Sequence, residues 1–126
     1  MASDDALADL FELSAQVRDV AVLGESGFVV ASSAAHERGE ELARVATGLL
    51  ALADEAPGRG DAAVSRVEVL DRDGGVFVVR DSGRVIVATT VADATPGLVV
   101  YDLRSTLGRY AAADAMQPTA RGRDDA

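Results

Sequence analysis

The sequence predicts an α+β domain in which one five-stranded antiparallel sheet is covered by helices on both faces. Three observations point to this fold class. The 126 residues suffice for one domain with a single core. Apolar residues switch between helical and strand spacing along the chain, which gives the order α-β-β-α-β-β-β-α. Only short turns separate the last three strands, and short connections favour antiparallel neighbours.

The N-terminal elements are a helix over residues 4–16 and a β-hairpin. Strands over 20–23 and 28–32 form the hairpin, and the Gly-Glu-Ser-Gly segment between them has the composition of a turn. Gly27 is expected to adopt a positive φ in that turn. The helix is predicted from residues at helical spacing, which are Leu7, Leu10, Phe11, Ser14 and Val17.

The strongest helical pattern lies over residues 40–56. The face expected to pack on the sheet consists of Leu42, Val45, Leu49, Leu52 and Ala53. A second face carries Arg44, Thr47, Gly48, Ala51 and Glu55. A glycine inside a helix costs about 1 kcal/mol relative to alanine. Gly48 therefore indicates a close approach, either by a helix of another molecule or by the chain's own sheet.

A loop over 57–63 leads to three strands, expected over 64–71, 75–81 and 84–90. The turns between them contain glycine and aspartate, which suit tight connections. The sequence thus predicts an antiparallel meander after the middle helix.

The last helix opens at Thr95 and Pro96, because threonine suits the N-cap and proline suits the first helical position. The domain is expected to occupy residues 1–112, and the polar residues 113–126 are expected to form a disordered tail. The apolar stripe of the helix consists of Val99, Val100, Leu103, Leu107 and Tyr110.

The central strands are apolar on both faces, so both faces need cover. Five strands span roughly 20 to 24 Å, and a helix is about 10 Å wide, so full cover needs about four helices. The chain offers three. If the first and last helices share one face, the middle helix is alone on the other. A second copy of the chain would supply the missing helix, which predicts a homodimer.

The strand over 64–71 has the pattern of an edge strand. Val67 and Val69 would face one side of the sheet, and Arg66 and Glu68 the other. Self-pairing of this strand about a two-fold axis would bring opposite charges near each other. A charged edge that stays in solvent is the alternative interpretation.

Charge and composition narrow the classes of function. The net charge of −9 disfavours nucleic acid and anionic lipid as partners. All twelve basic residues are arginine, so a Walker-type lysine or a Schiff base is excluded, and there is no cysteine. No apolar run approaches the roughly 20 residues of a membrane span, and no secretory signal pattern is present. We expect a cytoplasmic protein.

The candidate catalytic motifs fail on spacing. Around Ser26, the second glycine comes one residue too early for a nucleophile elbow, and neither a phosphate loop nor a dinucleotide fingerprint fits. Asp71 and Asp73 resemble part of a calcium loop, but Gly75 occupies the next ligand position, so a turn explains them better. His36, the single histidine, is expected in a surface loop. The Arg-Gly-Asp tripeptide at 59–61 has the sequence of a known cell-adhesion motif, and we expect this match to be a coincidence within a loop.

Four segments together resemble the Roadblock/LC7 family, in particular bacterial members encoded beside Ras-like small GTPases. They are the hairpin AVLGESGFVVASS, the helix LARVATGLLALA, the strand pair GGVFVVRDSGRVIVATT and the helix start ATPGLVVYDLRSTL. The resemblance covers about residues 4–111, and it depends on the order and spacing of all four segments.

The resemblance implies a dimer in which the middle helix and the third strand meet their counterparts. It also implies a protein without its own catalysis or cofactor that regulates or scaffolds a Ras-like small GTPase. Some relatives activate the GTPase by reorganising its own switch residues. By position, Arg44, Thr47, Gly48 and Ala51 match the exposed helix face. A small-ligand sensor with a pocket between sheet and helices is the alternative function.

Overall fold

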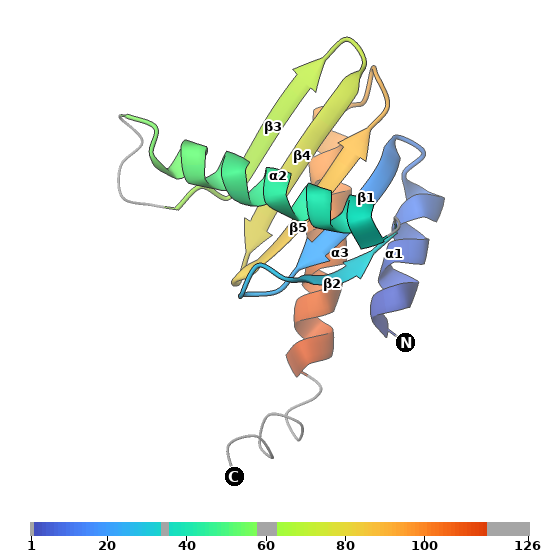
Figure 1. Ribbon diagram of the computed structural model, residues 1–126. Coiled ribbons are helices and arrows are strands. Elements are labelled where there is room, and N and C mark those ends of the chain that lie inside the picture. Colours follow the sequence, from blue (N-terminus) through green and yellow to red (C-terminus); the bar gives the residue numbers. More distant parts are fainter. Residues whose placement is uncertain (1, 34–35, 58–62, 116–126) are drawn as a thin grey trace.

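The computed structural model describes residues 2–33, 36–57 and 63–115. Its eight elements follow the predicted order, and the fold is α+β (Figure 1). The helices are α1 (Ala2–Leu13), α2 (His36–Asp54) and α3 (Pro96–Ala115). The strands are β1 (Val17–Leu23), β2 (Val29–Ser32), β3 (Arg66–Asp71), β4 (Gly74–Asp81) and β5 (Arg84–Thr90).

The five strands form one antiparallel sheet in the order β2-β1-β5-β4-β3. The N-terminal hairpin joins the meander through the β1–β5 pair. β2 and β3 are therefore the two edge strands. The predicted edge position of β3 is confirmed.

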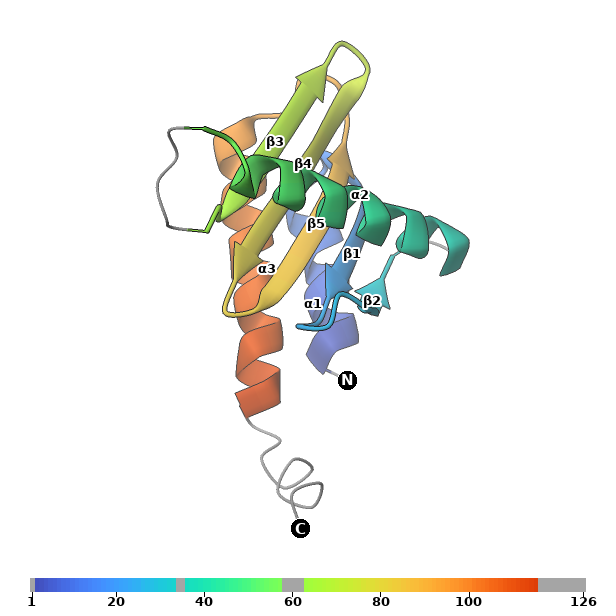
Figure 2. The ribbon, with the colours of Figure 1, turned by 60° about the vertical axis from the view of Figure 1, so that its left-hand side comes forward.

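Helices cover both faces of the sheet, as predicted. α1 and α3 pack side by side on one face, and α2 crosses the other face by itself (Figures 1 and 2). The strands alternate between these layers: Phe77 and Val79 point toward α1 and α3, whereas Val76 and Val78 point toward α2. This alternation confirms that the central strands are apolar on both faces.

The core beneath α1 and α3 is the larger of the two. It contains the fully buried Phe77 and Ile86 together with Leu10, Leu103 and Leu107. Each such side chain stabilises the fold by about 1.5 to 3 kcal/mol when fully buried. The core beneath α2 is thinner and includes two alanines of the helix. Its buried members are Ala21, Leu23, Leu42, Ala43, Ala46, Leu50, Val78 and Val87.

The first helix is shorter than predicted. It ends at Leu13 instead of residue 16, and Val17 opens β1, where it pairs with Thr90. The Gln16 carbonyl accepts a hydrogen bond from the Val91 N–H at 2.9 Å, which fixes the connection to the far end of β5. Val17 is an apolar residue of the same core as α1, and this explains why the sequence pattern assigned it to the helix.

The start of the middle helix also differs from the prediction. α2 begins at His36, four residues earlier than predicted, so His36 opens a helix and is not part of a loop. α3 continues to Ala115, so the expected domain end at residue 112 falls within this helix. Most of the expected tail (116–126) and the tripeptide at 59–61 lie outside the described residues.

Candidate interaction surface

The outer face of α2 carries the residues that the sequence predicted for contact with a partner. The helix turns its opposite side to the sheet, where Leu42, Ala43, Ala46 and Leu50 are buried. Its outward side is open to solvent in the single chain. The exposed residues include Arg44, Thr47, Gly48, Ala51 and Glu55.

The predicted sheet-facing stripe of α2 is wrong at two of its positions. Val45 is 39% exposed and Leu52 is 71% exposed. The helix is rotated toward Ala43 and Ala46, whose small side chains let its backbone approach the sheet closely. Two large apolar side chains are consequently left in solvent on either side of Gly48.

The position of Gly48 decides between the two interpretations of this glycine. A Cβ atom at Gly48 would meet no atom within 4 Å beyond its neighbours and the backbone of its own helix. Close packing against the chain's own sheet is therefore wrong as an explanation. The exposed side of Gly48 instead leaves room for the close approach of another helix.

β3 presents two different faces at the edge of the sheet. Val67 packs into the core beneath α2, and Val69, which is 46% exposed, points to the same side. Arg66 and Glu68 point to the α3 side, because Glu68 pairs with Phe77 in register. Their side chains form an ion pair within the strand, with Arg66 Nε 3.1 Å from Glu68 Oε2.

The two edge strands differ in their ability to pair with another strand. β2 has only four residues, and its pairing with β1 shifts between Val22 and Leu23. Short, irregular edge strands hinder further pairing. β3 pairs with β4 from Arg66 to Asp71 without any shift. The regular edge of the sheet is thus the one beside α2's C-terminal end.

Arg80 on β4 ties the end of α2 to the segment that leads into β3. Its Nη2 donates to both carboxylate oxygens of Asp54, the last residue of α2. Its Nε donates to the Val64 carbonyl at 2.9 Å, and the Val64 N–H donates to Asp54 Oδ1 at 2.9 Å. These bonds set the position of α2 relative to the β3 edge.

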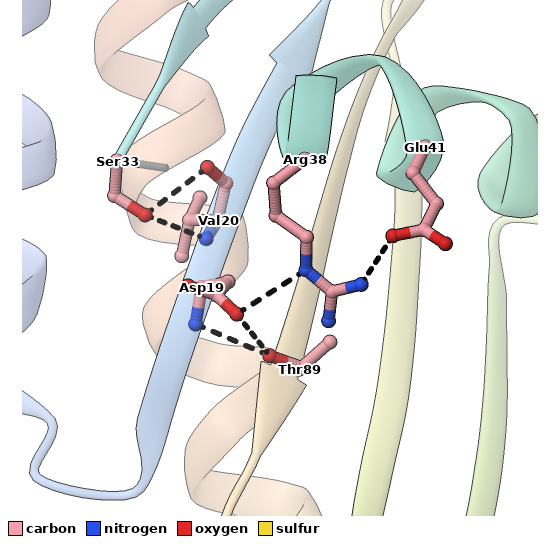
Figure 3. Close-up of polar contacts among 6 residues, drawn as sticks. All are labelled: Asp19, Val20, Ser33, Arg38, Glu41 and Thr89. Atoms are coloured by element: carbon pink, nitrogen blue, oxygen red, sulfur yellow. Dashed lines mark hydrogen bonds and ion pairs between the residues drawn. The ribbon is translucent and has the colours of Figure 1, made fainter. Parts of the chain in front are cut away.

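A second polar cluster fixes the first turns of α2 to the sheet (Figure 3). The Arg38 guanidinium lies between Glu41 on its own helix and Asp19 on β1, with 3.6 Å from Nε to Asp19 Oδ2. The Asp19 N–H donates to Thr89 Oγ1 at 3.2 Å. The hydrogen bond to Glu41 is the main cause that raises the pKa of Arg38 above its ordinary value. Ion pairs therefore connect both ends of α2 to the sheet.

The Gly-Glu-Ser-Gly segment is a tight turn. The Gly24 N–H donates to the Phe28 carbonyl and the Gly27 N–H to the Gly24 carbonyl, both at 3.0 Å. Gly27 has a φ of 88°, which confirms its predicted role. Ser26 is exposed at the tip. Its place in a solvent-facing turn explains the serine without a catalytic role.

Asp71 also has a local structural role. Its Oδ1 accepts hydrogen bonds from the N–H groups of Asp73 and Gly74, at 2.8 and 3.2 Å. A carboxylate that bonds the backbone two residues onward is the usual stabiliser of such a turn. Within residues 2–33, 36–57 and 63–115, no group of three histidine, aspartate or glutamate side chains is placed to hold a metal ion.

Open grooves border α2 on its two sides. One of about 410 Å³ has an apolar floor of Leu23, Leu50 and Val85, and Arg80 lines its rim. Another groove of about 290 Å³ includes Val69 in its lining.

No helix in the described part of the chain is long and apolar enough to cross a membrane.

Solved structures share this arrangement of elements. A Roadblock/LC7 domain from Streptomyces avermitilis superposes with a TM-score of 0.70 at 19% identity, covering 80% of this chain and 88% of that one. Another Roadblock/LC7 domain of that organism superposes with a TM-score of 0.67 at 25% identity, covering 84% and 95%. This chain has the Roadblock/LC7 fold.

The Roadblock/LC7 fold also relates the chain to a gliding protein. MglB from Thermus thermophilus superposes with a TM-score of 0.62 at 17% identity, covering 83% of this chain and 82% of MglB. No protein-family model and no curated protein sequence matches the chain. The fold is thus established by structural likeness.

Sequence reasoning missed Arg80 and Asp54 as residues that position the surface. A signal was present, because Arg80 directly follows the apolar run at residues 76–79 within one strand, and a partly buried arginine requires a partner. The partner itself lies 26 residues away in the chain and follows only from the fold.

Proposed function

We propose that this chain forms a homodimer through the outer face of α2 and the edge of β3, and that the dimer is a non-enzymatic regulator or adaptor of a Ras-like small GTPase. The observation that carries the proposal is the uncovered apolar surface on the α2 face. Val45, Leu52 and Val69 are exposed there, next to the open position of Gly48.

A second copy accounts for these features together. Large apolar side chains gathered on one face of a small domain usually mark an interaction site. Isologous contact would place α2 of the second copy beside α2 of the first, with Gly48 permitting close approach. The regular β3 edge would extend the sheet across the two-fold axis. The residues proposed for the interface are Arg44, Thr47, Gly48, Ala51, Glu55, Arg66, Val67, Glu68 and Val69.

The choice of a small GTPase rests on the resemblance of the four sequence segments to the Roadblock/LC7 family, and the fold shared with two Roadblock/LC7 domains supports it. The described residues offer binding surfaces and no catalytic constellation. We therefore expect the GTPase to supply all of the chemistry. The dimer would act by binding one conformation of the GTPase more tightly than the other, which shifts their populations.

A pull-down tests the partner. The tagged full chain is mixed with each small GTPase of the host, loaded with GTP or with GDP. We expect one GTPase to bind, with a preference for one nucleotide state. Phosphate release with and without the chain then separates an activator from a scaffold. If every small GTPase of the host ignored the chain in both states, the proposed partner would be wrong.

The small-ligand sensor is less well supported. The groove of about 410 Å³ contains Arg80, but its guanidinium already donates to Asp54 and Val64. Pockets for small molecules present polar groups that converge on the ligand. A rise of the melting temperature with a nucleotide or metabolite, at micromolar concentration, would favour the sensor.

A further inference from the structure

We propose that a second copy pairs along β3 in a single register, centred on Val67, and that the charges of this edge select a like chain. The inference rests on the dimer of the proposed function. It further specifies which residues face each other across the two-fold axis, and why the chain would prefer a second copy of itself over a different partner.

The face on which the two α2 helices meet determines the direction of the symmetry axis. For both α2 helices to meet on one face, the two-fold axis must run perpendicular to the sheet. Residues directly opposite each other in an antiparallel pair point to the same face, while neighbours along a strand point to opposite faces. The axis must therefore lie midway between the two β3 strands, at the level of one residue that faces its own copy, and it cannot lie at the level of a peptide bond between two residues. We call this residue the centre of the register.

The charged residues of β3 favour one of these centres over its neighbours. A centre at Arg66 places two arginines opposite each other, and a centre at Glu68 places two glutamates opposite each other. Both arrangements are unfavourable, because like charges directly opposite destabilise a strand pair. A centre at Val67 places Arg66 opposite Glu68 of the second copy, and by symmetry it does so twice.

The centre at Val69 is also less favourable. It would place Val67, which belongs to the apolar α2 side, opposite the carboxylate of Asp71 of the second copy. It would further bring Arg66 opposite Arg72, beyond the end of the strand. The centre at Val67 combines an apolar pair on one face with opposite charges on the other.

The two charged residues of β3 already form an ion pair within the strand. Arg66 Nε lies 3.1 Å from Glu68 Oε2, on the α3 side of the sheet. In the centred register, the two pairs of the dimer form a ring of four alternating charges. A different chain with another edge sequence would leave this ring incomplete. Complementary charges that a wrong partner cannot satisfy are a general means of specificity.

Charge exchange tests the register. The variants are Arg66→Glu, Glu68→Arg and the double variant with both changes, each studied as the full chain by analytical ultracentrifugation. We expect each single change to weaken the dimer about tenfold or more, because four like charges then meet. The double variant should recover the affinity. A mixture of the two single variants should form mixed dimers in preference to either homodimer.

The mixture separates contact between chains from contact within one chain. Each single variant also carries like charges within its own strand, and this defect remains in the mixture. Recovery on mixing can therefore come only from charges of the second copy. The control is Arg109→Glu, which disrupts a comparably exposed ion pair with Asp9 on the α1–α3 side and should leave the dimer unchanged.

The failures can be distinguished. If the wild type is dimeric and the single variants dimerise equally well, the register is wrong while the dimer stands. The same holds if the mixture shows no preference for mixed dimers. A wild type that stays monomeric overturns the register and the proposed dimer together. Binding of a small GTPase is read separately in the pull-down.

Discussion

The Arg80 guanidinium contacts both carboxylate oxygens of Asp54, with Nη2 2.9 Å from Oδ1 and 3.1 Å from Oδ2. Asp54 ends α2, and Arg80 lies on β4 beside the edge strand. Arg80 and Asp54 also bond the two backbone groups of Val64. The contact therefore sets how the C-terminal end of α2 lies relative to β3, the two parts of the proposed dimer surface.

Replacing Arg80 by leucine is expected to lower the free energy of unfolding by about 1 to 2 kcal/mol. The variant loses a partly exposed ion pair and a hydrogen bond to the backbone, and it leaves Asp54 without this cation. Urea unfolding measures the change. The control is Arg104→Leu on the exposed side of α3, which should change stability by less than about 0.5 kcal/mol. Equal stability of the two variants would contradict the role of Arg80.

Two substitutions of Gly48 should have different effects, one on the stability of the single chain and the other on the dimer. Gly48→Ala should raise the stability of the single chain by roughly 1 kcal/mol, because alanine favours a helix and its Cβ meets open space. Gly48→Trp should leave the fold intact and weaken the dimer, since the indole blocks close approach of the second helix. Thermal unfolding and sedimentation measure the two effects. A tryptophan variant that dimerises normally would refute the close-approach interpretation.

Leu50 and Leu52 form a matched pair on α2. Leu50 is buried against the sheet, and Leu52 is exposed. We expect Leu50→Ala to destabilise the fold by about 2 to 5 kcal/mol, as is usual for a buried leucine. Leu52→Ala should cost less than about 1 kcal/mol in stability yet weaken self-association. If Leu52→Ala left self-association unchanged, the uncovered apolar surface would not be part of the interface.

Salt provides a further check on the charged edge. The proposed ring of Arg66 and Glu68 should weaken as ionic strength rises, because salt screens exposed charges over about 10 Å at 0.1 M. The apolar contacts of α2 should persist. We therefore expect a modest rise of the dimer dissociation constant with salt, measured by ultracentrifugation. The rise should be smaller for Arg66→Ala, which removes the two arginines of the ring. A salt response identical in Arg66→Ala and the wild type would argue against the ring.

The order of elements and the two-faced sheet followed from the sequence because both depend on local spacing. Apolar residues at successive positions, such as Phe77 and Val78, predict that the central strands are buried on both faces. The count of helices then pointed to an uncovered face. These inferences need no knowledge of which segments meet in space.

The orientation of α2 could not be predicted in the same way. Two stripes compete on this helix, one through Leu42, Ala46 and Leu50 and the other through Val45 and Leu52. Spacing alone favours the larger side chains, whereas the folded chain buries the alanines because they allow the helix to lie close to the sheet. The choice is a tertiary effect.

The mass of the full chain in solution tests the central claim most directly. One chain has a mass of 13.0 kDa, so two chains give 2 × 13.0 = 26.0 kDa. Light scattering coupled to size-exclusion chromatography, at micromolar concentration, is expected to give the mass of two chains for the wild type and of one chain for Gly48→Trp. A wild-type protein that elutes as a 13.0 kDa monomer at every micromolar concentration measured would contradict the proposal.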